Sequence, residues 1–224
     1  MMKALAIRHV LAEHLGVMEP ILKGMGFEVD YLDTAKGEVL SRPLEEYALL
    51  VVLGGYMGAY EEHVYPFLSY EFRILEEALK LEVPVVGICL GCQMLAKALG
   101  SKVYRGEKGK EIGWMEVCKV GEHPIFEDFP KSLRVFQWHG DTFDLPVGAI
   151  RIYASEKYEN QAFVYGQAVG LQFHIEVDKS MVEEWARLYW DELEKEGIEE
   201  EALAWKEEYS INFTLLGNLL KRLT

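Results

Sequence analysis

The segment that decides the fold reads Val85-Val86-Gly87-Ile88-Cys89-Leu90-Gly91-Cys92-Gln93. A short apolar run, typical of a buried strand, leads directly into a helical pattern through a cysteine that has a glycine two positions before it and another two after it. Such a turn needs small flanking residues because its central residue adopts a cramped backbone conformation. We therefore expect Cys89 to project above the carboxyl edge of a parallel sheet, where ligands of open α/β sheets bind.

Strand and helix patterns continue on both sides of this segment. Compact apolar runs at residues 4–7, 27–32 and 49–53 precede it, and helical periodicity covers residues 68–79 and 94–99. Alternating strands and helices predict right-handed crossovers and an open, mainly parallel α/β sheet with helices on both faces. Shorter strand-like segments then follow, and they predict a mixed or antiparallel extension of the same sheet; they lie at 114–120, 133–138, 150–154, 162–165 and 168–173.

A helical tail is predicted after this sheet. Asp178 is placed as a helix N-cap before an apolar stripe that includes Trp185, and Gly197 interrupts the helical pattern. We expect an acidic helix containing Trp205 and a last helix with one apolar face, formed by Phe213, Leu216, Leu220 and Leu223. The predicted organisation is one domain over residues 1–178 and an acidic helical extension over 179–224 that packs on it.

The composition restricts the possible partners. The 224 residues include 37 acidic and 23 basic side chains, a formal charge of −14, which argues against binding to nucleic acid or anionic lipid. Residues 178–208 alone hold 12 acidic and 4 basic residues, so this part is either a solvated face or a docking surface for a basic partner. Three cysteines do not form a disulfide framework, and the sequence shows neither an export signal nor a membrane span. These features predict a cytoplasmic protein whose partners are small molecules or proteins.

A possible base for Cys89 lies near the end of the predicted sheet. In Gln172-Phe173-His174-Ile175-Glu176 the histidine and glutamate are two positions apart, so their side chains leave an extended strand on the same face. The carboxylate of Glu176 can orient the imidazole, and His174 can take a proton from the thiol and deliver it to a leaving amine. The positive potential at a helix N-terminus favours the reactive thiolate of Cys89.

Acyl chemistry also needs donors for an oxyanion. The N–H of Leu90, the first helical residue after Cys89, is one candidate, and the glycine-rich turn Leu53-Gly54-Gly55-Tyr56-Met57-Gly58 offers a second at the same sheet edge. This turn lacks the Gly-Lys-Ser/Thr ending of a phosphate loop and the full dinucleotide fingerprint.

Taken together, these motifs resemble the class I glutamine amidotransferases, and among them the amidotransferase domain of GMP synthases. Four segments match the family in order and spacing across roughly residues 45 to 180: the Gly54-Gly55 turn, the Cys89 turn, Gln137-Trp138-His139-Gly140-Asp141 and the ending at Glu176. The resemblance implies the family's flavodoxin-like fold. It also implies that a cysteine attacks the side-chain amide of glutamine, forms a γ-glutamyl thioester, and releases ammonia and then glutamate, without a cofactor or a metal.

The resemblance also implies roles for individual residues. Cys89 would be the nucleophile, His174 the general base and acid, and Glu176 its orienting partner, with oxyanion donors from Gly55 and Leu90. Substrate contacts would come from Gly54, Tyr56, Gln93, Trp138, His139, Gly140 and Asp141. The chain has Ile175 where the family usually has proline, and Trp138 where a small polar residue is common; the tryptophan is expected to reshape the rim of the pocket.

Other interpretations of these residues stay open. Cys89-Leu90-Gly91-Cys92 is also a C-x-x-C at a helix start, so a thiol–disulfide oxidoreductase is a weaker alternative. A zinc site from the two cysteines, His139 and His174 has no compact ligand pattern behind it. We assign no function to Cys118, expected to be a packed strand residue, or to four further histidines, expected in loops or on helix surfaces without paired acids nearby in sequence: His9, His14, His63 and His123.

The length bears on the product of the reaction. Nothing after Glu176 resembles the ATP-pyrophosphatase domain of fused GMP synthases, with its Ser-Gly-Gly-x-Asp-Ser loop, so these residues are expected to provide glutamine hydrolysis alone. Either ammonia passes to a separate synthetase subunit, or the enzyme is a free-standing hydrolase of glutamine or of another γ-glutamyl amide or peptide.

Overall fold

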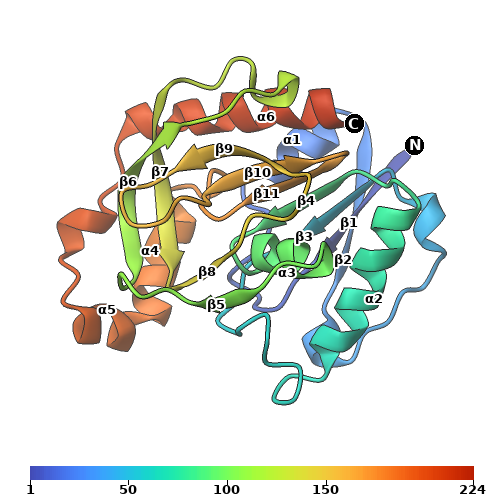
Figure 1. Cartoon of the computed structure of the whole chain (residues 1–224), viewed down its shortest axis with the longest axis horizontal. Coiled ribbons are helices and arrows are strands. Elements are labelled where there is room, and N and C mark those ends of the chain that lie inside the picture. The colour runs from blue at the N-terminus through green and yellow to red at the C-terminus, as the bar shows by residue number, and fades with distance from the viewer.

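The computed structural model describes residues 1–224 and is built around a nine-stranded sheet (Figure 1). The strands lie in the order β2 (Phe27–Leu32), β1 (Met2–Ile7), β3 (Leu49–Val52), β4 (Val85–Ile88), β11 (Ala168–Leu171), β10 (Ala162–Tyr165), β9 (Ile150–Ala154), β6 (Glu111–Lys119) and β7 (Ser132–His139). The first five pair in parallel and the others are antiparallel. The predicted mainly parallel sheet with an antiparallel extension is confirmed.

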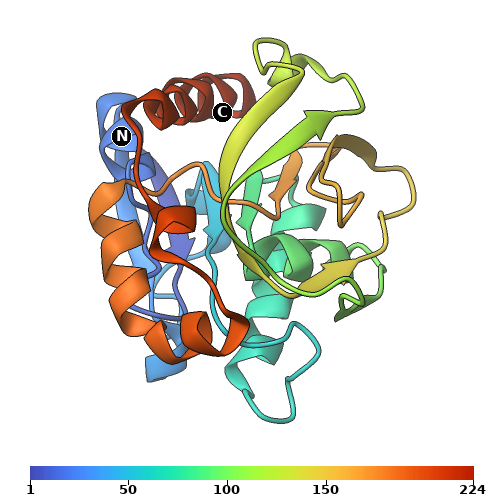
Figure 2. The ribbon, with the colours of Figure 1, turned by 90° about the vertical axis from the view of Figure 1, so that its left-hand side faces the viewer.

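Helices cover both faces of the parallel strands (Figures 1 and 2). Side chains of β1 alternate between the two faces: Ala4 and Ala6 pack with α1 (Met18–Gly24) and α6 (Ile211–Leu223), whereas Leu5 and Ile7 pack with α2 (Phe67–Lys80) and α3 (Leu90–Ala98). This alternation explains why the strands are apolar on both sides, as buried parallel strands are. None of the helices is long and apolar enough to cross a membrane.

A second, two-stranded antiparallel sheet of β5 (Val103–Arg105) and β8 (Asp141–Phe143) was not predicted from the sequence. Its strands are three residues long, too short to show an alternating pattern. Their register places Arg105 opposite Asp141. The small sheet therefore brings an arginine close to a segment that the sequence assigned to substrate binding.

The C-terminal segment wraps around one end of the sheet, next to β6 and β7, before α6 returns across one face (Figure 2). It consists of α4 (Lys179–Leu188), α5 (Trp190–Glu196), two 3₁₀ turns at Glu200–Leu203 and Glu207–Ser210, and α6. As predicted, Asp178 is an N-cap whose carboxylate accepts a hydrogen bond from the Met181 N–H at 2.9 Å, and Gly197 ends α5 in the left-handed conformation.

The prediction of an acidic helix around Trp205 is wrong, because Ala204, Trp205 and Lys206 are not helical. The indole of Trp205 stacks on Phe213, with ring centroids 5.8 Å apart, and meets Trp114 edge-on at 5.6 Å. This aromatic packing holds the segment as a connection between two single 3₁₀ turns. Tertiary contacts override the helical propensity of the surrounding glutamates here.

Candidate active site

The turn that carries Cys89 lies in the middle of the sheet, between β4 and α3. Cys89 has φ +54° and ψ −109°, a conformation that residues with a side chain rarely adopt. The glycines on either side allow this conformation because backbone atoms of other residues approach them more closely than a side chain would permit. A Cβ on Gly87 would lie 2.4 Å from the Gly91 carbonyl oxygen, and one on Gly91 would lie 1.9 Å from the Val52 carbonyl oxygen. The cysteine is therefore held in a strained turn that only glycine neighbours permit.

His174 and Glu176 follow β11, which pairs in parallel with β4 and so ends at the same sheet edge as Cys89. His174 Nδ1 lies 2.6 Å from Glu176 Oε1, and both side chains are buried. Burial alone would lower the pKa of His174, but the charge of Glu176 and the hydrogen bond with Cys89 raise it well above its usual value. The structure thus brings together the three residues that the sequence proposed as a catalytic triad.

The second cysteine of the C-x-x-C is in a different environment. Cys92 is completely buried, and this burial raises the pKa of its thiol well above the usual value. A buried thiol held in its neutral form is a poor partner in disulfide exchange. Cys118, by contrast, is exposed rather than packed as expected, since its side chain lies on the outward face of β6.

The glycine turn after β3 lies beside Cys89. A Cβ on Gly54 would be 3.5 Å from the Cβ of Cys89 and 3.6 Å from Cε1 of His174, and one on Gly55 would be 3.1 Å from a methyl carbon of Leu90. The N–H of Gly55 makes no hydrogen bond within the protein, and Leu90 is the first residue of α3, where N–H groups have no partner in the helix.

His9 fixes this turn, a role that the sequence did not assign to it. It is buried, with Nδ1 3.0 Å from the Gly54 carbonyl oxygen and Nε2 2.6 Å from Glu71 Oε2. Burial opposes a charge on His9, but the hydrogen bond and the charge of Glu71 raise its pKa on balance. The ring is thus fixed at both of its nitrogens. No local pattern indicated the pair, since Glu71 is 62 residues away.

The segment that contains Trp138, His139, Gly140 and Asp141 lines the other side of the pocket. The His139 ring is held between the Asp141 carbonyl oxygen at 2.8 Å and Glu111 Oε1 at 2.9 Å. Its side chain therefore fixes the shape of the segment. The amide of Gln93 donates to the Asp141 carbonyl oxygen at 3.4 Å and to Gln172 at 3.1 Å, so it is also a buried bracing group. Cys89 Sγ lies 3.5 Å from the Trp138 carbonyl oxygen.

The C-terminal segment contributes to the pocket through residues that the sequence did not reveal. The Trp138 indole donates to Glu192 at 3.0 Å, and Lys110 forms ion pairs with Glu192 and Glu196 of α5. Tyr189 donates to Glu13 at 2.8 Å. These contacts join residues up to 176 positions apart, so no local pattern could have shown them.

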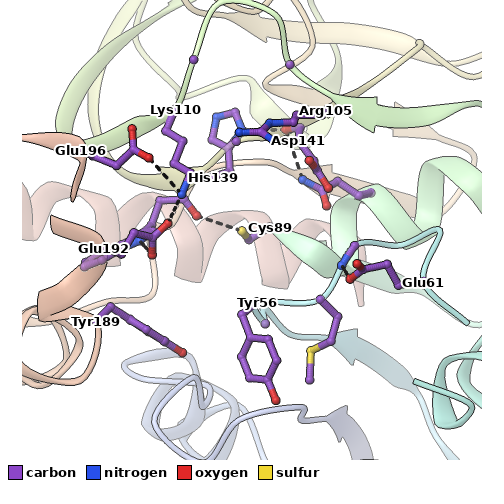
Figure 3. Close-up of a pocket in the computed structure, with 18 of the residues that line it drawn as sticks. Tyr56, Glu61, Cys89, Arg105, Lys110, His139, Asp141, Tyr189, Glu192 and Glu196 are labelled. Atoms are coloured by element: carbon purple, nitrogen blue, oxygen red, sulfur yellow. Dashed lines mark hydrogen bonds and ion pairs between the residues drawn. The ribbon is translucent and has the colours of Figure 1, made fainter. Parts of the chain in front are cut away.

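The pocket above Cys89 has a volume of about 620 Å³ (Figure 3). Figure 3 shows Arg105, His139 and Asp141 on one side of Cys89, and Tyr56 and Tyr189 on the other. Six acidic residues line it, against two basic ones: Glu13, Glu61, Glu107, Asp141, Glu192 and Glu196, with Arg105 and Lys110. Burial raises the pKa of Asp141. No group of three or more His, Cys, Asp or Glu side chains is arranged to hold a metal ion.

The family model described as glutamine amidotransferase class-I matches residues 19–184. The chain belongs to this family. A glutamine amidotransferase-like protein of Salmonella typhimurium, YfeJ, is 31% identical over 182 residues, which are 78% of this chain and 76% of that protein. One subunit of the glutamine-hydrolyzing GMP synthase of Thermococcus kodakarensis is 40% identical over 107 residues, 46% of this chain and 56% of that protein.

Solved structures of glutamine amidotransferases agree with this membership. The crystal structure of one from Thermotoga maritima superposes with a TM-score of 0.94 at 58% identity and covers 99% of this chain and 97% of that one. Another, from Methylobacillus flagellatus, has a TM-score of 0.84 at 28% identity and covers 100% and 92% of the two chains. In both comparisons almost the whole of this chain is covered, including the C-terminal segment.

Proposed function

We propose that the chain hydrolyses the side-chain amide of glutamine with Cys89 as the nucleophile. The observation that carries the proposal is the arrangement of Cys89, His174 and Glu176 at one sheet edge, with the cysteine on a strained turn and the histidine held by a buried carboxylate. His174 accepts the thiol proton, and the resulting imidazolium is stabilised by Glu176. The thiolate then attacks the amide carbon.

The oxyanion that forms in this step needs two N–H donors. Gly55 and Leu90 supply them in our proposal, because both N–H groups flank Cys89 and are free of other protein partners at that edge. The buried His9 pair, which contacts the carbonyl oxygen of Gly54, keeps this turn in place. The intermediate then collapses to a γ-glutamyl thioester as the leaving nitrogen takes the proton from His174, and water hydrolyses the thioester.

The glutamyl half of the substrate fits the side of the pocket that contains Arg105 and Asp141. A guanidinium and a carboxylate that face each other across the β5–β8 pair suit the α-carboxylate and the α-ammonium group of glutamine. Gln93 and the His139–Glu111 pair hold the backbone around Gly140. Tyr56 lines the opposite side, and Gly54 lies next to Cys89.

A second candidate substrate is a γ-glutamyl amide or peptide that is larger than glutamine. The pocket volume of about 620 Å³ favours it, since that lies within the range of sites for drug-sized ligands. Ammonia transfer to a separate synthetase is the other fate we propose for the product, by analogy with the GMP synthase relatives.

The test is glutamate release from glutamine and from γ-glutamyl dipeptides, by the chain alone and with a candidate synthetase. We expect activity from the wild type and from Cys92→Ser, and none from Cys89→Ser. A glutamate analogue with a γ-electrophile should label Cys89 at one equivalent per chain. Failure of this label under reducing conditions would remove Cys89 as the nucleophile.

A further inference from the structure

One buried carboxyl group beside the triad has no part in the mechanism above. Glu13 follows β1 in the sequence, is 8% exposed, and lines the pocket. A Cβ on Gly54 would lie 2.7 Å from Glu13 Oε1, 3.5 Å from Cys89 Cβ and 3.6 Å from His174 Cε1. One methyl-sized position thus touches the glutamate, the cysteine and the histidine at once.

The two oxygens of Glu13 have different surroundings. Oε2 accepts the hydrogen bond from Tyr189 at 2.8 Å, whereas Oε1, on the Gly54 side, has no hydrogen-bond partner in the protein. Burial and the charge of Glu13 raise the pKa of Tyr189, so the phenol keeps its proton and donates it. Burial also raises the pKa of Glu13, an effect that the Tyr189 hydrogen bond and the charge of His174 oppose. Because Glu13 lines the pocket and its Oε1 has no donor in the protein, this oxygen is available to accept a hydrogen bond from a bound ligand.

The position of Glu13 matches one specific substrate atom. In amide hydrolysis the leaving nitrogen departs on the side of the histidine that protonates it. The Arg105 and Asp141 side of the pocket suits the glutamyl half, which leaves the Tyr56 and Tyr189 side for the leaving group (Figure 3). Glu13 is held on this side by Tyr189.

We propose that Glu13 Oε1 accepts a hydrogen bond from an N–H of the leaving nitrogen, so that Glu13 is a leaving-group-binding residue positioned by Tyr189. As the C–N bond breaks, its electrons pass to nitrogen, the proton comes from the His174 imidazolium, and the cysteine sulfur keeps the acyl group. Glu13 transfers no proton in this step. It orients the nitrogen so that its developing lone pair faces His174.

The proposal also gives the C-terminal segment a role in the reaction. Tyr189 directly follows α4, and the neighbouring Trp185 packs edge-on against His174 with centroids 4.9 Å apart. The segment would therefore hold the leaving-group side of the site. This inference rests on the proposed function.

The experiment compares two substrates that differ in the leaving atom. L-glutamine leaves through a nitrogen that carries N–H groups, whereas the γ-methyl ester of L-glutamate leaves through an oxygen that carries no hydrogen. We expect Glu13→Ala to lower kcat/KM for glutamine by roughly 10- to 100-fold, the effect of losing one charge-assisted hydrogen bond, and to change the ester reaction by less than about threefold. Glu13→Gln should show the same selectivity with a smaller loss, because its amide oxygen can still accept.

Further variants separate this role from a structural one. Tyr189→Phe should show a weaker form of the same selectivity, because Glu13 stays but loses its tether. Glu184→Gln removes an exposed carboxylate from α4 and should leave both reactions unchanged. If Glu13→Ala does not fold, Glu13→Gln carries the comparison, with its melting temperature and the labelling of Cys89 as checks.

The outcomes separate the two proposals. Equal losses on both substrates, or no loss on either, would overturn the role of Glu13 while the glutaminase proposal stands. A wild-type chain that hydrolyses neither substrate and is not labelled at Cys89 would overturn the proposed function, and the inference with it.

Discussion

Glu176→Gln offers a test of how the buried carboxylate supports His174. The two side chains are 2% and 3% exposed and 2.6 Å apart, so water does not screen their interaction. Oε2 of Glu176 is buried without a hydrogen-bond partner, which leaves His174 as the one group that compensates the charge. The substitution keeps an oxygen that can accept from Nδ1 and removes the charge.

The expected loss of activity in Glu176→Gln follows from this geometry. Breaking a buried ion pair costs about 3 to 5 kcal/mol, and because the hydrogen bond survives we take the lower end, about 3 kcal/mol. If that energy stabilises the imidazolium during the reaction, kcat/KM for glutamine falls roughly 100-fold. His174→Ala, which removes the acid and base itself, should cost more, about 10⁴-fold.

The pH profile supplies the more specific readout. The charge of Glu176 raises the pKa of His174, and its removal lowers that pKa. The imidazolium that protonates the leaving group is then lost at a lower pH, so the alkaline limb of kcat/KM moves to lower pH in the variant. Glutamate release measured from about pH 6 to about pH 10 would show this shift, and Glu183→Gln, an exposed carboxylate on α4, serves as the control. An unmoved alkaline limb with less than a threefold loss of activity would refute the reasoning.

Three further predictions concern the turn, the second thiol and the C-terminal segment. Cys89→Ala should abolish glutamate release while Cys92→Ser largely preserves it, at a stability cost of about 1 to 3 kcal/mol for the buried hydroxyl; the reverse order of activities would indicate redox chemistry. Gly91→Ala should prevent correct folding, measured by circular dichroism and Cys89 labelling, because the Cβ would lie 1.9 Å from a backbone oxygen, whereas Gly24→Ala, with nothing within 4 Å, should be tolerated. Trp185→Phe leaves the Ala12 carbonyl oxygen without its 2.7 Å donor, so we expect a loss of about 1 to 3 kcal/mol and a melting temperature lower by roughly 2 to 12 °C; an unchanged melting temperature would contradict it.

The parts of the fold that the sequence predicted are those with local signals. Strands such as Phe27–Leu32 and Ile150–Ala154 match their predicted ranges because each is a compact apolar run between turn residues. The Cys89 turn was recognisable because its geometry requires two glycines at fixed spacing, and both make close backbone contacts in the structure. Cys89 and His174 could be placed together because they follow two strands of one parallel sheet, and neighbouring parallel strands end at the same edge.

The parts that could not be predicted depend on contacts between distant residues. The three-residue strands β5 and β8 acquire their conformation from each other, and Trp205 leaves the helical pattern because three aromatic rings surround it. His9 was expected in a loop or on a helix surface and was given no function, since its partner Glu71 lies on a helix 62 positions away. In each case both contacting residues can be read in the sequence, but the fold that brings them together cannot be read from a local pattern.

The site residues also divide into those that a local motif predicted and those that only the structure revealed. The residues proposed for chemistry lie in motifs, whereas several that shape the two sides of the pocket, such as Arg105, Glu13 and Tyr189, lie outside them, on β5, on the loop after β1 and on the C-terminal segment. The Lys110, Trp138 and Tyr189 contacts attach that segment to the pocket wall through charged and aromatic side chains. Because the cysteine, the histidine and the glutamate act on the amide bond itself in our proposal, we expect substrate choice to come from these walls. A change in the Glu13 and Tyr189 pair would then alter which leaving group is accepted and leave the nucleophile intact.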